Sequence, residues 1–261
     1  MELKEKYTID DLIQIMERLR QPDGCPWDRV QTHQSIKKSL IEETYEAIDA
    51  LDFGDDKAFA NELGDVLLQV VFHSQIAKER NAFDFSDVVT EICTKLITRH
   101  THVFGEDNAG NEDEALANWE ANKKKEKKLS SNTAVLKDVP KYLPALMRAE
   151  KIQKKASKLG FDWDDAEGAY QKVCEEAEEL KEAQKSGKTE DIYEEYGDLL
   201  FSVVNLGRFL GAEPETALTA ASNKFISRFE KMEQLAVANG KDMSQMTISE
   251  LDELWNCAKQ Q

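Results

Sequence analysis

The fold is decided by EETYE at residues 42–46 and ELGDVLL at residues 62–68, because both stretches occur twice. They return 133 residues later as EEAEE at residues 175–179 and EYGDLLF at residues 195–201. The four tryptophans also pair, at a spacing of 136 residues, and TKLITR from Thr94 corresponds to NKFISR from Asn223. Matches at a nearly constant spacing indicate a duplicated unit. The chain therefore carries two copies of one domain in tandem.

Composition and apolar spacing predict helices in both copies. Glycine (12) and proline (5) are scarce among 261 residues, and Val66, Val70 and Val71 recur at helical spacing. We expect helices near residues 12–19, 34–52, 57–80, 86–100 and 114–126, and again near 142–158, 166–186, 189–210, 214–239 and 247–258. The predicted fold class is all-α, a tandem repeat of two related helical bundles.

The predicted boundary between the copies follows Trp119. Residues 122–140 are first charged, then rich in serine and asparagine, and end in a proline, as a linker would. We therefore expect a first domain over residues 1–121, a linker over 122–140 and a second domain over 141–261.

The charge of the chain limits its partners. With 51 acidic and 34 basic residues the formal net charge is −17, which argues against binding a nucleic-acid polymer. An anionic substrate would need an accompanying cation. The four cysteines lie far apart, and no apolar run is long enough to span a membrane. These features predict a reduced cytoplasmic protein without membrane contact.

The repeated acidic motifs predict a cation site. In EExxE and ExxD, carboxylates three or four residues apart share one helix face, and antiparallel packing of the two helices would bring them together. Such clusters are often only solvated faces, but each ExxD here runs into an apolar segment and both motifs recur together. Oxygen ligands of this kind suit Mg²⁺, which commonly bridges to substrate phosphates.

Positive charge near the acids would have to come from side chains. Lys172 precedes Glu175 by three residues and Glu176 by four, so it shares their helix stripe. Lys224 and Arg228 also share a face of a later helix, although each of these basic residues could simply be solvated. Trp255 could either stack on a base or belong to the core.

These motifs resemble those of the MazG-type nucleoside triphosphate pyrophosphohydrolases, in the all-α pyrophosphatase superfamily. GCPWD from Gly24, IEETYE from Ile41, ELGDVLLQVVFH from Glu62, RAEKIQKKASKLGFDW from Arg148 and EEYGDLLF from Glu194 carry the resemblance, which covers nearly the whole chain. It implies a homodimer that uses Mg²⁺ to cleave many ribo- and deoxyribonucleoside triphosphates to a monophosphate and pyrophosphate.

The resemblance also implies residue roles. It assigns the metal to Glu176, Glu179, Glu195 and Asp198, with Glu175 beside them, and nucleotide binding to Lys172, Lys224, Arg228 and Trp255. A second metal site in the first copy would use Glu43, Glu46, Glu62 and Asp65. The family's second copy is generally the catalytic one, and here Ser39 stands where that copy has Lys172. One departure from the family pattern is Ser222, where asparagine is expected.

The predicted mechanism is metal-assisted hydrolysis, with Glu175 as the residue that orients or deprotonates water. Two alternatives stay open. One is a narrow-specificity relative, such as a dUTPase-like or phosphoribosyl-ATP-cleaving enzyme. The other is a nucleotide-binding regulatory or interaction protein with a decayed site.

Overall fold

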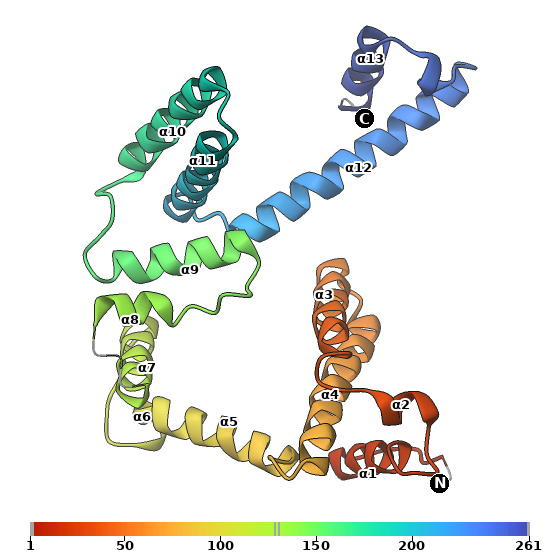
Figure 1. Ribbon diagram of the computed structural model, residues 1–261, viewed down its shortest axis with the longest axis vertical. Helices are drawn as coiled ribbons and strands as arrows, with labels where there is room; N and C mark the ends of the chain where they lie inside the picture. Colours follow the sequence, from red (N-terminus) through yellow and green to blue (C-terminus); the bar gives the residue numbers. More distant parts are fainter. Residues whose placement is uncertain (1–2, 128, 130, 260–261) are drawn as a thin grey trace. The chain divides into compact units, whose positions relative to one another are not determined.

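The computed structural model describes residues 3–127, 129 and 131–259, which contain helices and no strand (Figure 1). This confirms the predicted all-α fold class. The chain divides into two compact units, Met1–Glu126 and Lys127–Gln261. Among the described residues, no helix has the length and apolar character needed to cross a membrane.

Unit 1 is built around a core between α1 (Ile9–Leu19) and α4 (Asp56–Glu79). Met16 of α1 is buried against Val71, Phe72 and Ile76 of α4, together with Ile36, the residue before α3 (Lys37–Phe53). Thr8 caps the start of α1 in a capping box with Asp11. The helices are α1 (Ile9–Leu19), α2 (Pro26–Val30), α3 (Lys37–Phe53), α4 (Asp56–Glu79), α5 (Phe85–Arg99), α6 (Thr101–Phe104) and α7 (Glu112–Glu126).

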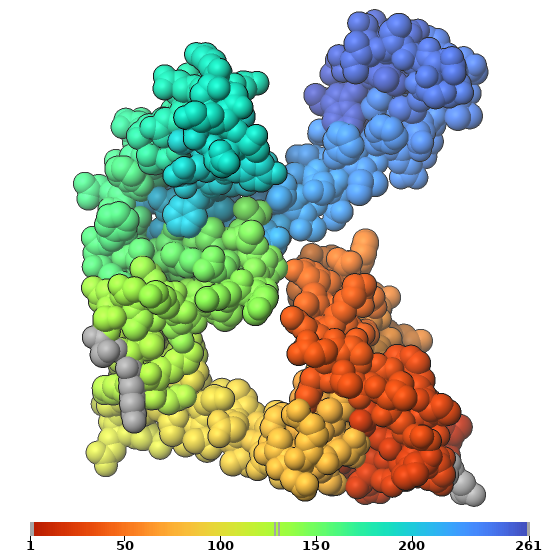
Figure 2. Space-filling model, viewed as in Figure 1, coloured from red at the N-terminus to blue at the C-terminus, as the bar shows by residue number. Residues whose placement is uncertain are grey.

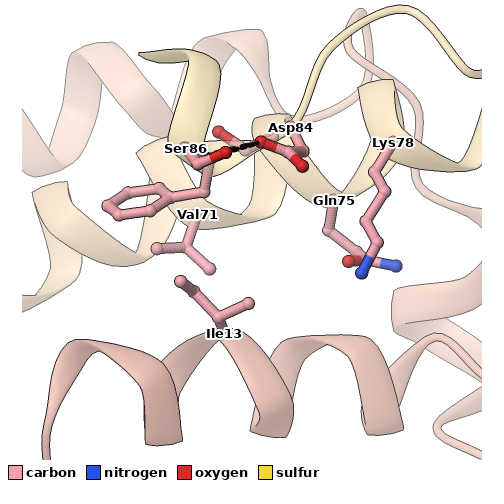
Figure 3. Close-up of a pocket in the computed structure, with 8 residues that line it drawn as sticks. Ile13, Val71, Gln75, Lys78, Asp84 and Ser86 are labelled. Carbon is pink, nitrogen blue, oxygen red and sulfur yellow. Dashed lines mark hydrogen bonds between the residues drawn. The ribbon is translucent and has the colours of Figure 1, made fainter. Parts of the chain in front are cut away.

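A small cavity of about 200 Å³ lies between α1, α4 and the first turn of α5 (Figure 3). Ile13, Val71 and Phe85 form its apolar wall, and the predicted site residues do not line it. Asp84 at its polar end is engaged as the N-cap of α5. We therefore assign this cavity to packing.

Unit 2, like unit 1 with α3 and α4, contains two long consecutive helices that pack against each other. Its helices are α8 (Asn132–Lys137), α9 (Ala145–Ser157), α10 (Ala166–Ser186), α11 (Thr189–Phe209), α12 (Pro214–Ala238) and α13 (Ile248–Lys259), with a 3₁₀ turn, η1, at Met243–Gln245. Helix α12 packs against α9 near its start and against α13 near its end. Its C-terminal half and α13 stand apart from α10 and α11 (Figure 2).

The long helices agree with the predicted ranges, and the differences are local. Helices α2, α6 and α8 were not predicted because four to six residues are too few for a periodic apolar pattern. Helix α9 begins at Ala145 because Pro144 disfavours helical geometry before it. The expected linker, residues 122–140, contains the end of α7 and all of α8, whose first turn is capped by the Ser131 hydroxyl. The assignment of these residues to a linker stays a prediction.

Candidate functional site

The acidic motifs meet because a glycine turn joins their helices at a fixed distance. Helix α3 ends at Gly54, which adopts a left-handed conformation (φ 71°), and α4 starts two residues later. Glu43 lies eleven residues before Gly54 and Asp65 eleven residues after it. In an antiparallel hairpin, residues equally far from the turn lie at the same depth. The same turn recurs 133 residues later at Gly187, also with φ 71°.

The second copy gathers three of its four predicted metal ligands. Carboxylate oxygens of Glu176, Glu179 and Glu195 all lie within 4.8 Å of one another. Glu176 is buried, with 5 % of its surface exposed. Burial raises the pKa of the Glu195 carboxyl, and the charges of Glu179, Glu176 and Asp198 raise it further. Asp198 is exposed and lies outside the closest set, although its charge reaches Glu195.

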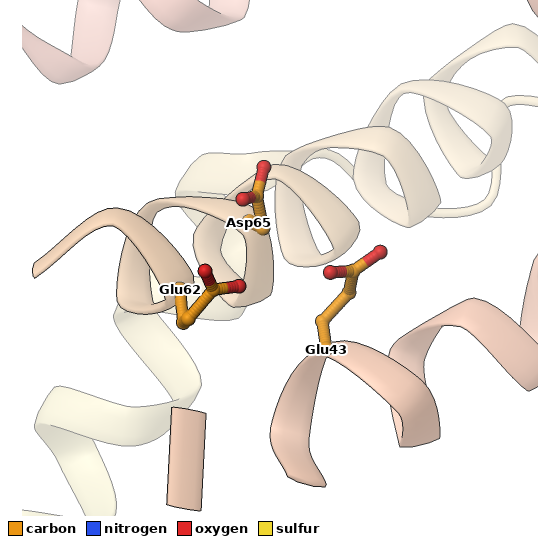
Figure 4. Close-up of side chains that lie close together, drawn as sticks. All are labelled: Glu43, Glu62 and Asp65. Carbon is orange, nitrogen blue, oxygen red and sulfur yellow. The ribbon is translucent and has the colours of Figure 1, made fainter. Parts of the chain in front are cut away.

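The first copy gathers a different three of its four equivalents. Glu43, Glu62 and Asp65 bring carboxylate oxygens within 4.8 Å of one another (Figure 4). The pKa of Glu43 is raised by burial first, and then by the charges of Asp65, Glu46 and Glu62. The amide of Asn61 donates to Glu62 at 3.2 Å. Glu46 is exposed and is not among the converging three.

A lysine distinguishes the two clusters. In the second copy, the Lys172 ammonium lies 2.8 Å from a Glu175 oxygen and 2.6 Å from a Glu176 oxygen. These two carboxylates raise the pKa of Lys172 above its ordinary value. In the first copy Ser39 occupies the equivalent position, and the neighbouring Lys38 pairs with Glu42 at 2.6 Å.

The other predicted nucleotide contacts lie on α12 and α13 of unit 2. The Arg228 guanidinium of α12 is 5.7 Å from the centre of the Trp255 ring of α13. Trp255 also borders a cavity of about 580 Å³, lined mainly by apolar side chains that include Phe225, Met243 and Ile248. Lys224 is exposed on α12. Within one chain, these residues and the acidic cluster are carried by different helix pairs.

Sequence reasoning missed part of this arrangement. The Lys259 ammonium lies 5.9 Å from the Trp255 ring centre, and the Phe225 ring lies 5.1 Å from it. Lys259 could have been found from the sequence, because it follows Trp255 by four residues and therefore shares its helix face. The unpredicted lining of the cavity depends on how α12 and α13 pack, which spacing within one helix does not encode.

Unit 1 repeats the aromatic and basic arrangement with one change. Arg99 and Lys123 lie 5.4 Å and 4.8 Å from the centre of the Trp119 ring. Arg99 is also held in a bidentate ion pair by Glu126, at 2.8 and 3.0 Å. Among the described residues, Arg228 has no such carboxylate partner.

The duplicated hairpin with its converging carboxylates has a counterpart in a known family. A sequence profile of the MazG nucleotide pyrophosphohydrolase domain matches residues 31–104 and again residues 165–232. The chain belongs to the MazG family. The two matches contain the two acidic clusters, and they confirm the resemblance stated from the sequence.

Three bacterial proteins are similar to this chain over nearly its whole length. A Thermotoga maritima protein named nucleoside triphosphate pyrophosphohydrolase/pyrophosphatase MazG is 50% identical over 96% of this chain and 95% of its own. An Escherichia coli nucleoside triphosphate pyrophosphohydrolase is 43% identical over 97% of each chain. The Bacillus subtilis protein YabN is 45% identical over 94% of this chain, which corresponds to half of YabN.

The MazG clusters have the donor set that a hard cation prefers. Both consist of carboxylate oxygens, without histidine or cysteine among the converging residues. Buried carboxylates that repel one another are stabilised by a cation between them. Oxygen-only ligands at a partly hydrated edge suit Mg²⁺ better than zinc or copper. The residues present therefore fit Mg²⁺.

Proposed function

We propose that this protein hydrolyses nucleoside triphosphates, both ribo- and deoxyribo-, to a nucleoside monophosphate and pyrophosphate, with Mg²⁺ as cofactor. The observation that carries the proposal is the convergence of Glu176, Glu179 and Glu195 beside the Lys172 ammonium. This combination offers ligands to a cation and a positive charge to phosphate. The activity named for the Thermotoga maritima and Escherichia coli relatives supports the same reaction.

Each group has a distinct role in this reaction. Glu176, Glu179, Glu195 and Asp198 would hold Mg²⁺, which when bound neutralises phosphate charge and lowers the pKa of a coordinated water. Glu175 is exposed next to the cluster and would orient or deprotonate the attacking water. Lys224 and Arg228 would pair with the phosphates, and Trp255 would stack on the nucleoside.

We assign turnover mainly to the second copy because two of its basic residues, Lys224 and Arg228, are available. In the first copy, Lys95 pairs with Glu91 at 3.4 Å and Arg99 is held by Glu126. Their counterparts Lys224 and Arg228 form no ion pair with a described residue. An arginine already bound to a carboxylate would have to give up that pair before it could bind phosphate. The first cluster is proposed as a second metal site.

A homodimer would complete this site. The acids lie on α10 and α11, whereas Lys224 and Arg228 lie on α12 and Trp255 lies on α13. The C-terminal half of α12 and α13 stand apart from the hairpin of α10 and α11 (Figure 1). Phe225 and Phe229, four residues apart on one face of α12, are 56% and 42% exposed and form an apolar surface there. Association of two copies would cover this face and could bring the basic residues of one chain to the acids of the other. The substrate is a single nucleotide rather than a nucleic-acid polymer.

Product analysis tests the proposal directly. Purified protein is incubated with each common ribo- and deoxyribonucleoside triphosphate, with Mg²⁺ or with EDTA, and the products are separated by anion exchange. The matched variants are Glu179→Gln and Glu46→Gln. They change equivalent positions of the two copies, and each removes one negative charge. We expect monophosphate and pyrophosphate from many bases, lost with EDTA and in Glu179→Gln, and retained in Glu46→Gln.

Two results would contradict the proposal. Binding of nucleotide without turnover, whether or not Mg²⁺ is present, would instead support a regulatory protein with a decayed site. Turnover of a single base would support a narrow-specificity relative.

A further inference from the structure

Lys172 pairs with two carboxylates of different burial, the 56% exposed Glu175 and the buried Glu176. Lys172 is the one cation within ion-pair distance of Glu176 in the described part of the chain, at 2.6 Å. The Glu176 side chain is only 7% exposed, so the carboxylate end of this pair is largely shielded from water. By contrast, Lys181 and Glu178 on the same helix form a pair in which the side chains are 61% and 70% exposed. An exposed pair of that kind contributes little.

The carboxylate that Lys172 contacts is also one of the three that converge. Glu176 presents an oxygen within 4.8 Å of oxygens from Glu179 and Glu195. A divalent cation bound by these three groups would neutralise the negative charge of Glu176 that attracts the Lys172 ammonium. Two cations on one carboxylate repel each other, so binding of the metal weakens the Lys172 pair.

We infer that Lys172 and the divalent cation compete for the Glu176 carboxylate, so that entry of the metal leaves the Lys172 ammonium on the exposed Glu175 alone, from which it can pair with a phosphate oxygen of the substrate. This inference rests on the proposed function. Lys172 is thereby a residue that couples metal binding to nucleotide binding. Without nucleotide, the metal binds less tightly than it would in a site without the lysine, because it must displace Lys172 from Glu176. With nucleotide present, the metal binds more tightly than it does alone, because the displaced lysine gains a phosphate partner.

The first copy supplies a natural comparison. Ser39 stands at the equivalent position, and Lys38 is directed to Glu42 rather than to Glu43. Among the described residues, Glu43 has no ion-pair partner. The first cluster should therefore bind a divalent cation without competition, and its metal affinity should not respond to nucleotide through a lysine.

The test measures metal affinity separately from turnover. Free Mn²⁺ is followed by electron paramagnetic resonance in the full chain, with Glu43→Gln and Glu62→Gln present so that only the second cluster titrates. In this background we expect Lys172→Ser to tighten Mn²⁺ binding about tenfold, because Mn²⁺ no longer has to displace one charge-assisted contact to reach Glu176. Lys181→Ser, the control on the same helix, should leave Mn²⁺ affinity unchanged.

A second titration adds an α,β-methylene triphosphate analogue, which resists cleavage. The analogue should increase Mn²⁺ affinity strongly when Lys172 is present and at least tenfold less in Lys172→Ser. The reciprocal variant, Ser39→Lys in a chain with Glu179→Gln and Glu195→Gln, should weaken Mn²⁺ binding at the first cluster. Unchanged or weaker Mn²⁺ binding in Lys172→Ser would overturn the inference. Absence of Mg²⁺-dependent hydrolysis by the wild type would instead overturn the proposed function, whatever the Mn²⁺ titrations give.

Discussion

Replacing Arg20 by methionine should destabilise unit 1 far more than the same change at Arg18. Both arginines form bidentate pairs, Arg20 with Glu79 (2.7 and 2.7 Å) and Arg18 with Asp23 (2.7 and 2.9 Å). The Arg20 side chain is 6% exposed and that of Arg18 is 58% exposed. The two positions therefore differ in burial while sharing their chemistry.

The expected magnitude follows from what Arg20 contacts. Breaking a fully buried pair costs about 3–5 kcal/mol, and partial exposure of Glu79 reduces that figure. Arg20 also donates to the carbonyl oxygens of Asp28 and Gln31, and each lost hydrogen bond costs about 1 kcal/mol. We expect Arg20→Met to lower the free energy of unfolding by about 3 kcal/mol, or about 10 °C in the unfolding temperature of a unit this size.

The assay is urea and thermal unfolding followed by circular dichroism at pH 7, with Arg18→Met as the control that should match the wild type. A pH series adds a second check. Arg20 holds the pKa of Glu79 below its ordinary value of 4.5, so the stability from this pair is present above pH 4.5 and is lost as the pH falls through the lowered pKa. The difference in unfolding free energy between the wild type and Arg20→Met should therefore become smaller as the pH falls. Equal destabilisation by the two substitutions would refute the reasoning from burial.

Three further predictions concern unit 1. The Nδ1 atoms of His33 and His73 are 2.8 Å apart, and burial lowers the pKa of both rings below 6.5, so stability should be complete above pH 6.5 and decline as the pH falls through the lowered values. His73→Gln should flatten that decline in unfolding experiments between pH 7 and 5, and an unchanged slope would count against it. A Cβ at Gly24 would lie 2.2 Å from the Leu19 carbonyl oxygen, so Gly24→Ala should cost about 2–3 kcal/mol of unfolding free energy. Gly64 lies within a helix with open space around it, so Gly64→Ala should raise the free energy of unfolding by about 0.5–1 kcal/mol. A lower free energy of unfolding in Gly64→Ala would show that another surface packs against this position.

The sequence was sufficient for features that depend on contacts within one helix or on the duplication itself. The positions of α3, α4, α10 and α11 followed from apolar periodicity, and the three- and four-residue spacing of acids put each motif on one helix face. Gly54 and Gly187 occupy equivalent positions, which the repeat already implied. Lys172 could be placed beside Glu176 for the same local reason.

Contacts between helices could not be read from spacing. The sequence predicted four equivalent carboxylates in each copy, but the closest three are Glu176, Glu179 and Glu195 in one and Glu43, Glu62 and Asp65 in the other. Which carboxylates converge depends on side-chain rotamers and on the angle between two packed helices, and neither follows from a 3.6-residue period.

The tertiary structure also decided which basic residues are engaged. Lys95 and Arg99 match Lys224 and Arg228 in sequence, yet Arg99 is held by Glu126 from a different helix, 27 residues further along the chain. The duplication determined that both copies carry the same kinds of side chain. Only the packing of α5 against α7 determined that one copy's arginine is bound to a carboxylate, because that pair requires two helices to be brought together in space.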